Sequence, residues 1–513
     1  MRAIPTPPAR TATARFTRFT LVALVALVSG CAVGPDFKTP DAVADTRYTT
    51  GPQPTQTGAA IMPDSGDARF GQSQSFVDGD VPAQWWALYR NPALDETIRA
   101  ALASSPTLRQ ASARLREAQE NLAARTGATQ FPSVDAKLSA TRQQVDLTSI
   151  GVTQFPSPGP FTLYNATVQV SYALDLFGGQ RRELEGLRAA VDYQRYELEA
   201  ARLSLAANVA TAAIREAGLR AQLADTVAIA EAQQRQLGIM RQRLQQGGVA
   251  RVDVQRQQAE LAQTQALIPG LSQQIDAARH QLAVYTGQTP ASAQLPEFRL
   301  EDMQLPDTLP VSLPSELARR RPDIRAAEAL LHQASADIGV ATANLYPQIT
   351  LTASGGTQQM RARDLFSSMN VWSLAAGVVQ PIFHGGELRA QKRAKEAAYE
   401  QSLGAYQQAV LQGLQNVADA LRTLEADAGT LQARADNARQ IRDTLSIVSE
   451  QYRLGGVSQF TLLDAERQAR QAALDLAQAK ANRLADSAAL MQALGGGWWQ
   501  QPATVGMTAP PAK

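Results

Sequence analysis

The amino-acid sequence predicts an α+β membrane protein in which long helices alternate with two β-hairpins. No proline occurs between Pro160 and Pro269 or between Pro381 and Pro502, so helices far longer than the usual 11–12 residues (about three turns) are possible. Two segments in each half of the chain alternate apolar and polar residues with a period of two, which is typical of strands. These elements follow one another in the same order twice, so we expect a two-fold internal repeat.

The first 30 residues have the features of a secretory signal peptide. Four arginines precede an apolar core from Phe19 to Val28, and this core is too short for a transmembrane helix, which needs about 20 residues. It is followed by "LVSGC", which resembles the bacterial lipobox and contains Cys31, the only cysteine. A lone cysteine cannot form an internal disulfide, and a free thiol is the alternative. We predict that Cys31 is the acylated N-terminus, and the resemblance implies outer-membrane sorting because Ala32 follows it.

The composition argues against nucleic acid as a partner. Without residues 1–30, the chain has 45 basic and 47 acidic residues, so it carries no general positive field. Aromatic residues make up 6% and charged residues 19% of the sequence. Alanine and glutamine are abundant, and this mixture favours long helices over an aromatic-rich sandwich.

The internal repeat sets the predicted domain boundaries. The stretch "PTLRQASARLREAQ" begins at Pro106 and "PDIRAAEALLHQAS" begins at Pro322, 216 residues later. Gly247 and Gly455 are 208 residues apart, and further anchors keep the same order. We therefore divide the chain into a signal peptide (1–30), a lipidated extended segment (31–90), a first repeat (91–287), a Pro-rich crossover (288–314), a second repeat (315–494) and an irregular tail (495–513).

Each repeat is expected to begin with one helix, at 91–124 in the first half, followed by a β-hairpin at 133–176 or 347–383. In the first hairpin Val134, Ala136 and Leu138 alternate with polar residues. Strands of about ten residues suit a tilted membrane crossing, although a half-buried soluble sheet shows the same alternation. The smallest membrane barrels have about eight strands, and lipid does not tolerate an open sheet edge. A barrel would therefore need several copies of the chain.

A long helical hairpin is predicted after each pair of strands, at 180–286 and 387–494. The first helix of each covers 180–246 or 387–454, and the second returns over 252–286 or 459–494. A glycine pair, Gly247-Gly248 or Gly455-Gly456, separates the two helices. Glycine readily takes the positive φ that ends a helix, so we expect these pairs to form the hairpin tips.

No arrangement of residues predicts catalysis. The three histidines, His280, His332 and His384, have no zinc-site spacing. We expect ordinary packed or surface roles for His280 and His332, and a role at the junction of strand and helix for His384 in "IFHGGE". GxxxxGK[ST], GxSxG and a GxGxxG after a strand are absent from the sequence. We therefore expect no enzyme, no metal and no cofactor.

Four motifs, in order, resemble the outer membrane factors (TolC/OprM-like), specifically the NodT-type lipoproteins of resistance-nodulation-division (RND) efflux systems. They are "CAVGPDFKTP", "QWWALYRNPALDETIRAALASSPTLRQ", "ELARRRPDIRAAEALLHQASADIGVATANLYPQITL" and "YRLGGVSQFTLLDAERQ". The resemblance implies a homotrimer with one 12-stranded outer-membrane barrel, four strands per chain, continued by a periplasmic barrel of coiled-coil hairpins. It also implies a passive exit duct that works with a periplasmic adaptor and an inner-membrane RND pump.

The same resemblance implies a periplasmic gate near the hairpin tips. Asp464 and Arg467 match the charged pair that closes OprM-type tunnels, while Asp253 and Tyr452 match TolC residues at the constriction. Val457 departs from TolC, which has arginine there, so the full TolC network is not expected. The tips at Gly247, Gly248, Gly455 and Gly456 are expected to dock the adaptor.

Two other functions compete with the efflux duct. One is the outer membrane component of a type I-like secretion system, and the other is a structural coiled-coil lipoprotein. Strands of bilayer length favour a duct over a structural coiled coil.

Overall fold

The computed structural model describes residues 32–500 apart from residues 42–43, 52–53, 147–150, 152–153 and 155–158. The chain forms two compact units, which we describe separately. The described residues of the first unit lie within 32–39, 116–193 and 328–405, and those of the second within 40–115, 194–327 and 406–500. Cys31, the predicted acylation site, lies outside the described residues.

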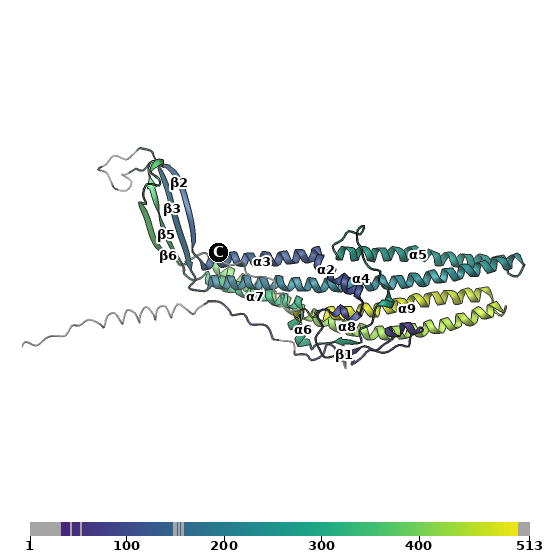
Figure 1. The fold of residues 1–513 in the computed structure, drawn as a ribbon. Coiled ribbons are helices and arrows are strands. Elements are labelled where there is room, and N and C mark those ends of the chain that lie inside the picture. The colour runs from purple at the N-terminus through teal and green to yellow at the C-terminus, as the bar shows by residue number, and fades with distance from the viewer. Residues whose placement is uncertain are drawn as a thin grey trace, which may run out of the picture. The chain divides into compact units, whose positions relative to one another are not determined.

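A four-stranded antiparallel sheet is the main element of the first unit (Figure 1). Its spatial order is β2 (Ser133–Gln143), β3 (Phe161–Leu174), β5 (Gln348–Gln359) and β6 (Val371–Val379). Strands β2 and β6 form the two edges, and no other strand in the described part of the chain pairs with them.

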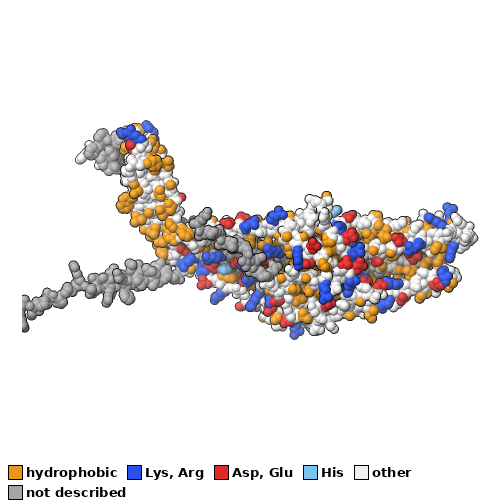
Figure 2. All heavy atoms as spheres, viewed as in Figure 1, with side chains coloured by type: hydrophobic (Ala, Val, Ile, Leu, Met, Phe, Trp, Pro, Cys, Tyr) orange, Lys and Arg blue, Asp and Glu red, His pale blue; other side chains and the backbone are white. Residues whose placement is uncertain are grey.

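The register of the sheet separates apolar from polar side chains. Directly paired residues form one row across all four strands, consisting of Val134, Val170, Ala353 and Leu374. The adjacent row, on the opposite face, consists of Asp135, Gln169, Ser354 and Ser373. Trp372 and Leu374 are 78% and 77% exposed in the single chain, and hydrophobic side chains gather over the visible part of the sheet (Figure 2). One face of the sheet therefore requires an apolar environment.

Two helical hairpins provide most of the remaining structure (Figure 1). Their helices are α4 (Gly179–Gln245), α5 (Arg251–Tyr285), α8 (Glu387–Arg453) and α9 (Gln459–Ala493). Helices α4 and α8 each have 67 residues, and α5 and α9 each have 35. Near the first tip, α4 and α5 pack through Leu237, Met240 and Val254. Within the described residues, every helix lacks the length or the apolar character needed to cross a membrane.

The single helix expected at 91–124 is wrong, because the chain forms two helices there. They are α2 (Pro92–Ser104) and α3 (Pro106–Gln130). Between them Ser105 has a ψ of 127°, since the ring of Pro106 disfavours the helical conformation in the residue before it. The second half has a similar break at Arg321 between α6 (Pro314–Arg320) and α7 (Pro322–Ala343).

The predicted extended segment (31–90) and the Pro-rich crossover (288–314) also contribute to the core of the second unit. Strand β1 (Ser75–Val77) pairs in parallel with β4 (Thr308–Pro310) from the crossover. Trp85 from the N-terminal segment and Phe298 from the crossover are fully buried in the main hydrophobic cluster. These buried aromatic residues thus hold segments rich in proline and glycine against parts of the core that are distant in the sequence.

Arg483 holds the N-terminal segment against α9. Its side chain is 1% exposed, and its guanidinium donates hydrogen bonds to the backbone carbonyls of Phe70 (2.9 Å) and Gln72 (2.7 Å) and to the hydroxyl of Thr57 (3.0 Å). Burial lowers the pKa of Arg483 to about 10, and the nearby Asp427 carboxyl opposes this shift. Burial and the Asp486 carboxyl in turn raise the pKa of Asp427 to about 7.

The raised pKa of Asp427 predicts a stability that falls as the pH rises. The folded state keeps this proton when an unfolded aspartate, with a pKa of about 3.9, has lost it, so stability declines between about pH 4 and 7. The Asp427→Asn variant cannot ionise here, so its unfolding temperature should rise relative to wild type as the pH increases from 5 to 8. Circular dichroism melts check this, with exposed Asp443→Asn on the same helix as control. A difference in unfolding temperature between Asp427→Asn and wild type that stays constant from pH 5 to 8 would contradict the raised pKa of Asp427.

Candidate functional site

The first candidate site is the turn between α4 and α5, which is closed by backbone hydrogen bonds alone. Gly248 N–H donates to the carbonyl of Arg243 (2.8 Å), and Gly247 N–H donates to that of Leu244 (3.0 Å). This pair of bonds is a Schellman motif, which satisfies carbonyls at the end of a helix. Gly247 has a φ of +74°, a conformation that costs other L-residues about 1–2 kcal/mol.

The turn between α8 and α9 has the same construction. Gly456 N–H donates to the carbonyl of Gln451 (2.8 Å), and Gly455 N–H, at a φ of +78°, donates to that of Tyr452 (3.1 Å). The hydroxyl of Ser458 then caps α9 by accepting from the N–H of Thr461 (3.3 Å). Both glycine pairs therefore end a long helix and reverse the chain.

Apolar side chains are exposed around both turns. Leu454 and Phe460 flank the second turn and are 70% and 64% exposed, and Val252 beside the first turn is 49% exposed. A single exposed apolar residue is common on protein surfaces, but a concentration of them at a helical tip is typical of a contact surface.

The structure brings Asp464 and Arg467 together on one turn of α9. The Arg467 guanidinium donates to one oxygen of Asp464, and the side-chain amide of Gln468 donates to the other oxygen (2.7 Å). Both charged side chains are substantially exposed. In the single chain this is a surface ion pair, and such pairs stabilise a helix by about 0.2–0.5 kcal/mol.

Charged residues from both hairpins lie around Tyr452, and Asp253 is one of them. Asp253 lies in the first turn of α5 and pairs with Arg256 at 3.7 Å. Burial raises the pKa of Tyr452; the acids Asp253 and Glu466 act in the same direction, and Arg243 opposes them. Tyr452 of α8 is therefore within electrostatic reach of α4, α5 and α9.

Sequence reasoning missed a buried polar layer between α5 and α9. The side-chain amide of Gln459 donates to that of Gln257 (2.8 Å), and both residues are buried. Arg470 donates to the Glu260 carboxylate (2.8 Å) and to the Thr264 hydroxyl (2.6 Å). Polar residues at i, i+3 and i+7 on an otherwise apolar helix face are the sequence feature that could have indicated this layer.

Residues that follow Cys31 are docked within the first unit. The N–H of Val33 donates to the carbonyl of Phe177 (3.0 Å), and Arg182 of α4 pairs with Asp36 (2.6 Å). Phe37 stacks on His332 of α7 with ring centroids 4.3 Å apart. The segment that begins at residue 32 is therefore held close to the end of β3 and the start of α4.

The three histidines show no cluster of metal ligands. His332 contacts Glu185 at 2.9 Å, and His384 lies 3.9 Å from Glu387. Among the residues that the structure describes, no group of three or more His, Cys, Asp or Glu side chains is arranged to hold a metal ion.

The chain resembles known proteins over most of its length. The sequence model of the family described as outer membrane efflux protein matches residues 97–288 and 313–496. Identity to the pyoverdine export outer membrane protein OpmQ of Pseudomonas putida is 31% over 450 residues, which cover 87% of this chain and 94% of that protein. Identity to the probable efflux pump outer membrane protein TtgC of Pseudomonas putida is 28% over 479 residues, which cover 92% of this chain and 94% of that protein.

The fold is also similar to a solved channel structure. The outer-membrane channel OprN matches with a TM-score of 0.80 and 29% identity, covering 91% of this chain and 100% of the OprN chain. The family predicted from the sequence is thus confirmed, together with its place in the outer membrane. The chain belongs to the outer membrane efflux protein family and acts as an outer membrane efflux channel.

Proposed function

We propose that three copies of the chain form the outer membrane exit duct of a tripartite efflux system. In this proposal small molecules pass from an inner-membrane RND pump and a periplasmic adaptor to the cell exterior. The observation that carries it is a four-stranded sheet with one apolar face and two open edges, in the same chain as two 67-residue helices. A structural coiled-coil lipoprotein would have no use for such a sheet.

The geometry of membrane barrels supports three copies of the chain. The strands alternate in direction, so β6 of one copy can pair with β2 of the next without breaking the antiparallel order. Two copies would make an eight-stranded barrel, whose interior is filled by side chains or holds one small ligand. Three copies make the 12-stranded barrel implied by the family resemblance, and this is the smallest closed multiple that leaves a duct.

The helices would form the periplasmic part of the same duct. Each chain contributes α4, α5, α8 and α9, so three chains supply twelve helices for one tunnel. The equal lengths of α4 and α8, and of α5 and α9, support the internal repeat, because equivalent hairpins can alternate around one axis.

Acylation of Cys31 would place the start of the chain at the membrane. The contacts of Val33 and Asp36 with the end of β3 and the start of α4 support this position. Mass spectrometry of the N-terminal peptide should show cleavage before Cys31 and attached acyl chains. An uncleaved and unmodified residue 31 would rule out the lipoprotein assignment.

The hairpin tips are proposed to dock the adaptor. Gly455→Val places a β-branched residue at positive φ and should disrupt the turn, so dye efflux from cells should be lost. Gly429→Val is the matched control, because Gly429 lies within α8 and a Cβ there would meet no neighbour within 4 Å.

A second tip variant separates docking from the fold of the turn. The double variant Leu454→Ser, Phe460→Ser replaces two exposed apolar side chains and leaves both glycines in place. It should abolish efflux while assembly is retained. Efflux at the wild-type rate in this variant and in Gly455→Val would show that the tips do not dock the adaptor.

The pair Asp464 and Arg467 is proposed to hold the periplasmic end closed. Threefold symmetry would repeat this pair around a narrow axis, where uncompensated like charges raise the electrostatic energy. Asp464→Ala with Arg467→Ala should therefore raise single-channel conductance in planar bilayers while the trimer still assembles. The control removes the exposed pair Arg434 and Asp475, which lie 2.6 Å apart. Wild-type conductance would refute the gate, and failure to assemble would show that the pair is structural.

A further inference from the structure

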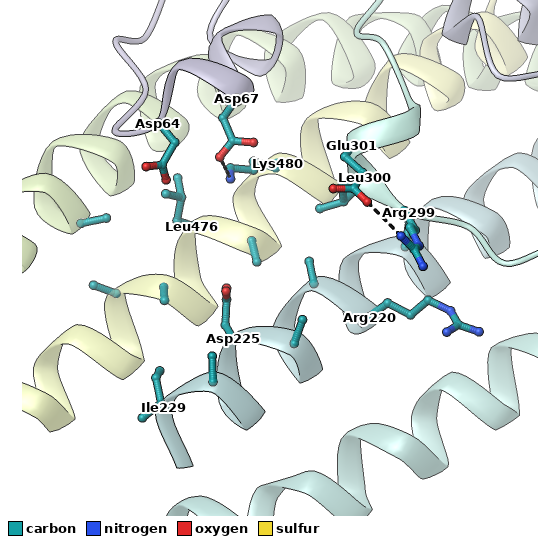
Figure 3. A pocket seen from close by; sticks show the side chains of 18 of the residues that line it. Asp64, Asp67, Arg220, Asp225, Ile229, Arg299, Leu300, Glu301, Leu476 and Lys480 are labelled. Carbon is teal, nitrogen blue, oxygen red and sulfur yellow. Dashed lines mark hydrogen bonds and ion pairs between the residues drawn. The ribbon is translucent and has the colours of Figure 1, made fainter. Parts of the chain in front are cut away.

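A cavity of about 750 Å³ opens in the second unit between α4, α8 and α9 (Figure 3). Alanines of α4 and α9 line much of its wall, together with Ile229 and Leu476. Helix α8, the N-terminal segment (through Asp64 and Asp67) and the crossover (through residues 297 and 299–301) supply the rest of the lining. Ligand sites in proteins have volumes of about 300–1,000 Å³, so the cavity has the size of a small-molecule site.

Charged residues beside the N-terminal segment neutralise one another. Arg442 of α8 makes two hydrogen bonds to the Asp64 carboxylate, at 2.7 and 3.1 Å. Lys480 of α9 forms an ion pair with Asp67 (Figure 3). Neither acid on this side therefore offers an uncompensated charge to a ligand.

Charged residues beside the crossover are also paired. Arg299 lies 3.3 Å from the carboxylate of Glu301, and Arg220 lies 3.4 Å from that of Glu297. Arg220 also contacts the buried carboxylate of Glu216 at 2.9 Å. The eight charges on these two sides of the cavity thus form four ion pairs.

Asp225 is the ninth charged residue of the lining, and it has no such partner. It projects from α4 towards the cavity (Figure 3), and its half-buried carboxyl has no ion pair or hydrogen bond to any residue that the structure describes. Burial raises the pKa of Asp225; Asp67 and Asp64 add to this effect, whereas Lys480 and Arg442 oppose it. Once ionised, Asp225 gives an otherwise neutral wall one negative charge.

We propose that this cavity binds an organic monocation, whose ammonium group contacts the Asp225 carboxylate and whose apolar body lies on the alanine-lined wall. A single carboxylate without an ion-pair partner of its own matches a single positive charge. A divalent metal ion is a poor match, because it takes several oxygen ligands and the neighbouring acids are already engaged. An anion would be repelled. The site does not depend on the proposed gate or docking tips.

Calorimetric titration of the full-length protein in lipid nanodiscs tests the proposal with two probes. The probes are 2-phenylethylamine, a monocation at neutral pH, and 2-phenylethanol, its neutral analogue. Wild type should bind the amine saturably and more tightly than the alcohol. Asp225→Asn should weaken amine binding about tenfold or more, because the amide keeps the shape of the side chain but lacks its negative charge. Lowering the pH through the pKa of Asp225 should weaken binding by wild type only.

Two further variants test whether the amine binds in the cavity and whether the effect is specific to Asp225. Ala224→Leu leaves every charge in place and fills part of the cavity from an exposed position on α4, so it should also weaken amine binding. Glu231→Gln removes an exposed acid from the same helix outside the cavity and should bind as wild type does. Equal amine affinity in wild type and Asp225→Asn, or no saturable binding in wild type, would overturn the proposal.

Discussion

The unpaired edges of the four-stranded sheet are the constraint on which the proposed duct depends. Every N–H and C=O group on the outer sides of β2 and β6 needs a partner in lipid, where an unsatisfied group costs several kcal/mol. A single copy of this sheet cannot meet that requirement alone. In the proposed duct, barrel closure and assembly are a single event, and the apolar row that includes Val134 and Leu374 acquires a lipid environment when it occurs.

Buried polar groups specify how the helices of the second unit are arranged. Arg483 holds backbone carbonyls of the N-terminal segment, and Arg470 reaches Glu260 across the interface of α5 and α9. Removing one member of a buried ion pair leaves an uncompensated charge, at a cost of about 3–5 kcal/mol. Alanine-rich helices have few bulky side chains to define their register, so such polar contacts distinguish one packing from neighbouring ones.

Local sequence patterns predicted the helices and strands, but they could not predict contacts between residues that are far apart in the sequence. The helix expected at 180–246 is found at Gly179–Gln245, because the glycine pair that ends it is visible in the sequence. Pro106 was equally visible, yet its effect on Ser105 was missed. The partners of Arg483 are more than 400 residues away, so no local pattern could indicate them. The proposed gate roles came from the family resemblance, because an isolated Asp464–Arg467 pair is an ordinary helix contact.

Native mass spectrometry of the purified protein, released from detergent, tests the central claim most directly. The account predicts a mass equal to three chains, each carrying the same N-terminal modification, in the preparation that conducts ions in planar bilayers. A single chain or a pair of chains that conducts would contradict it, because four strands cannot close and eight strands leave no duct.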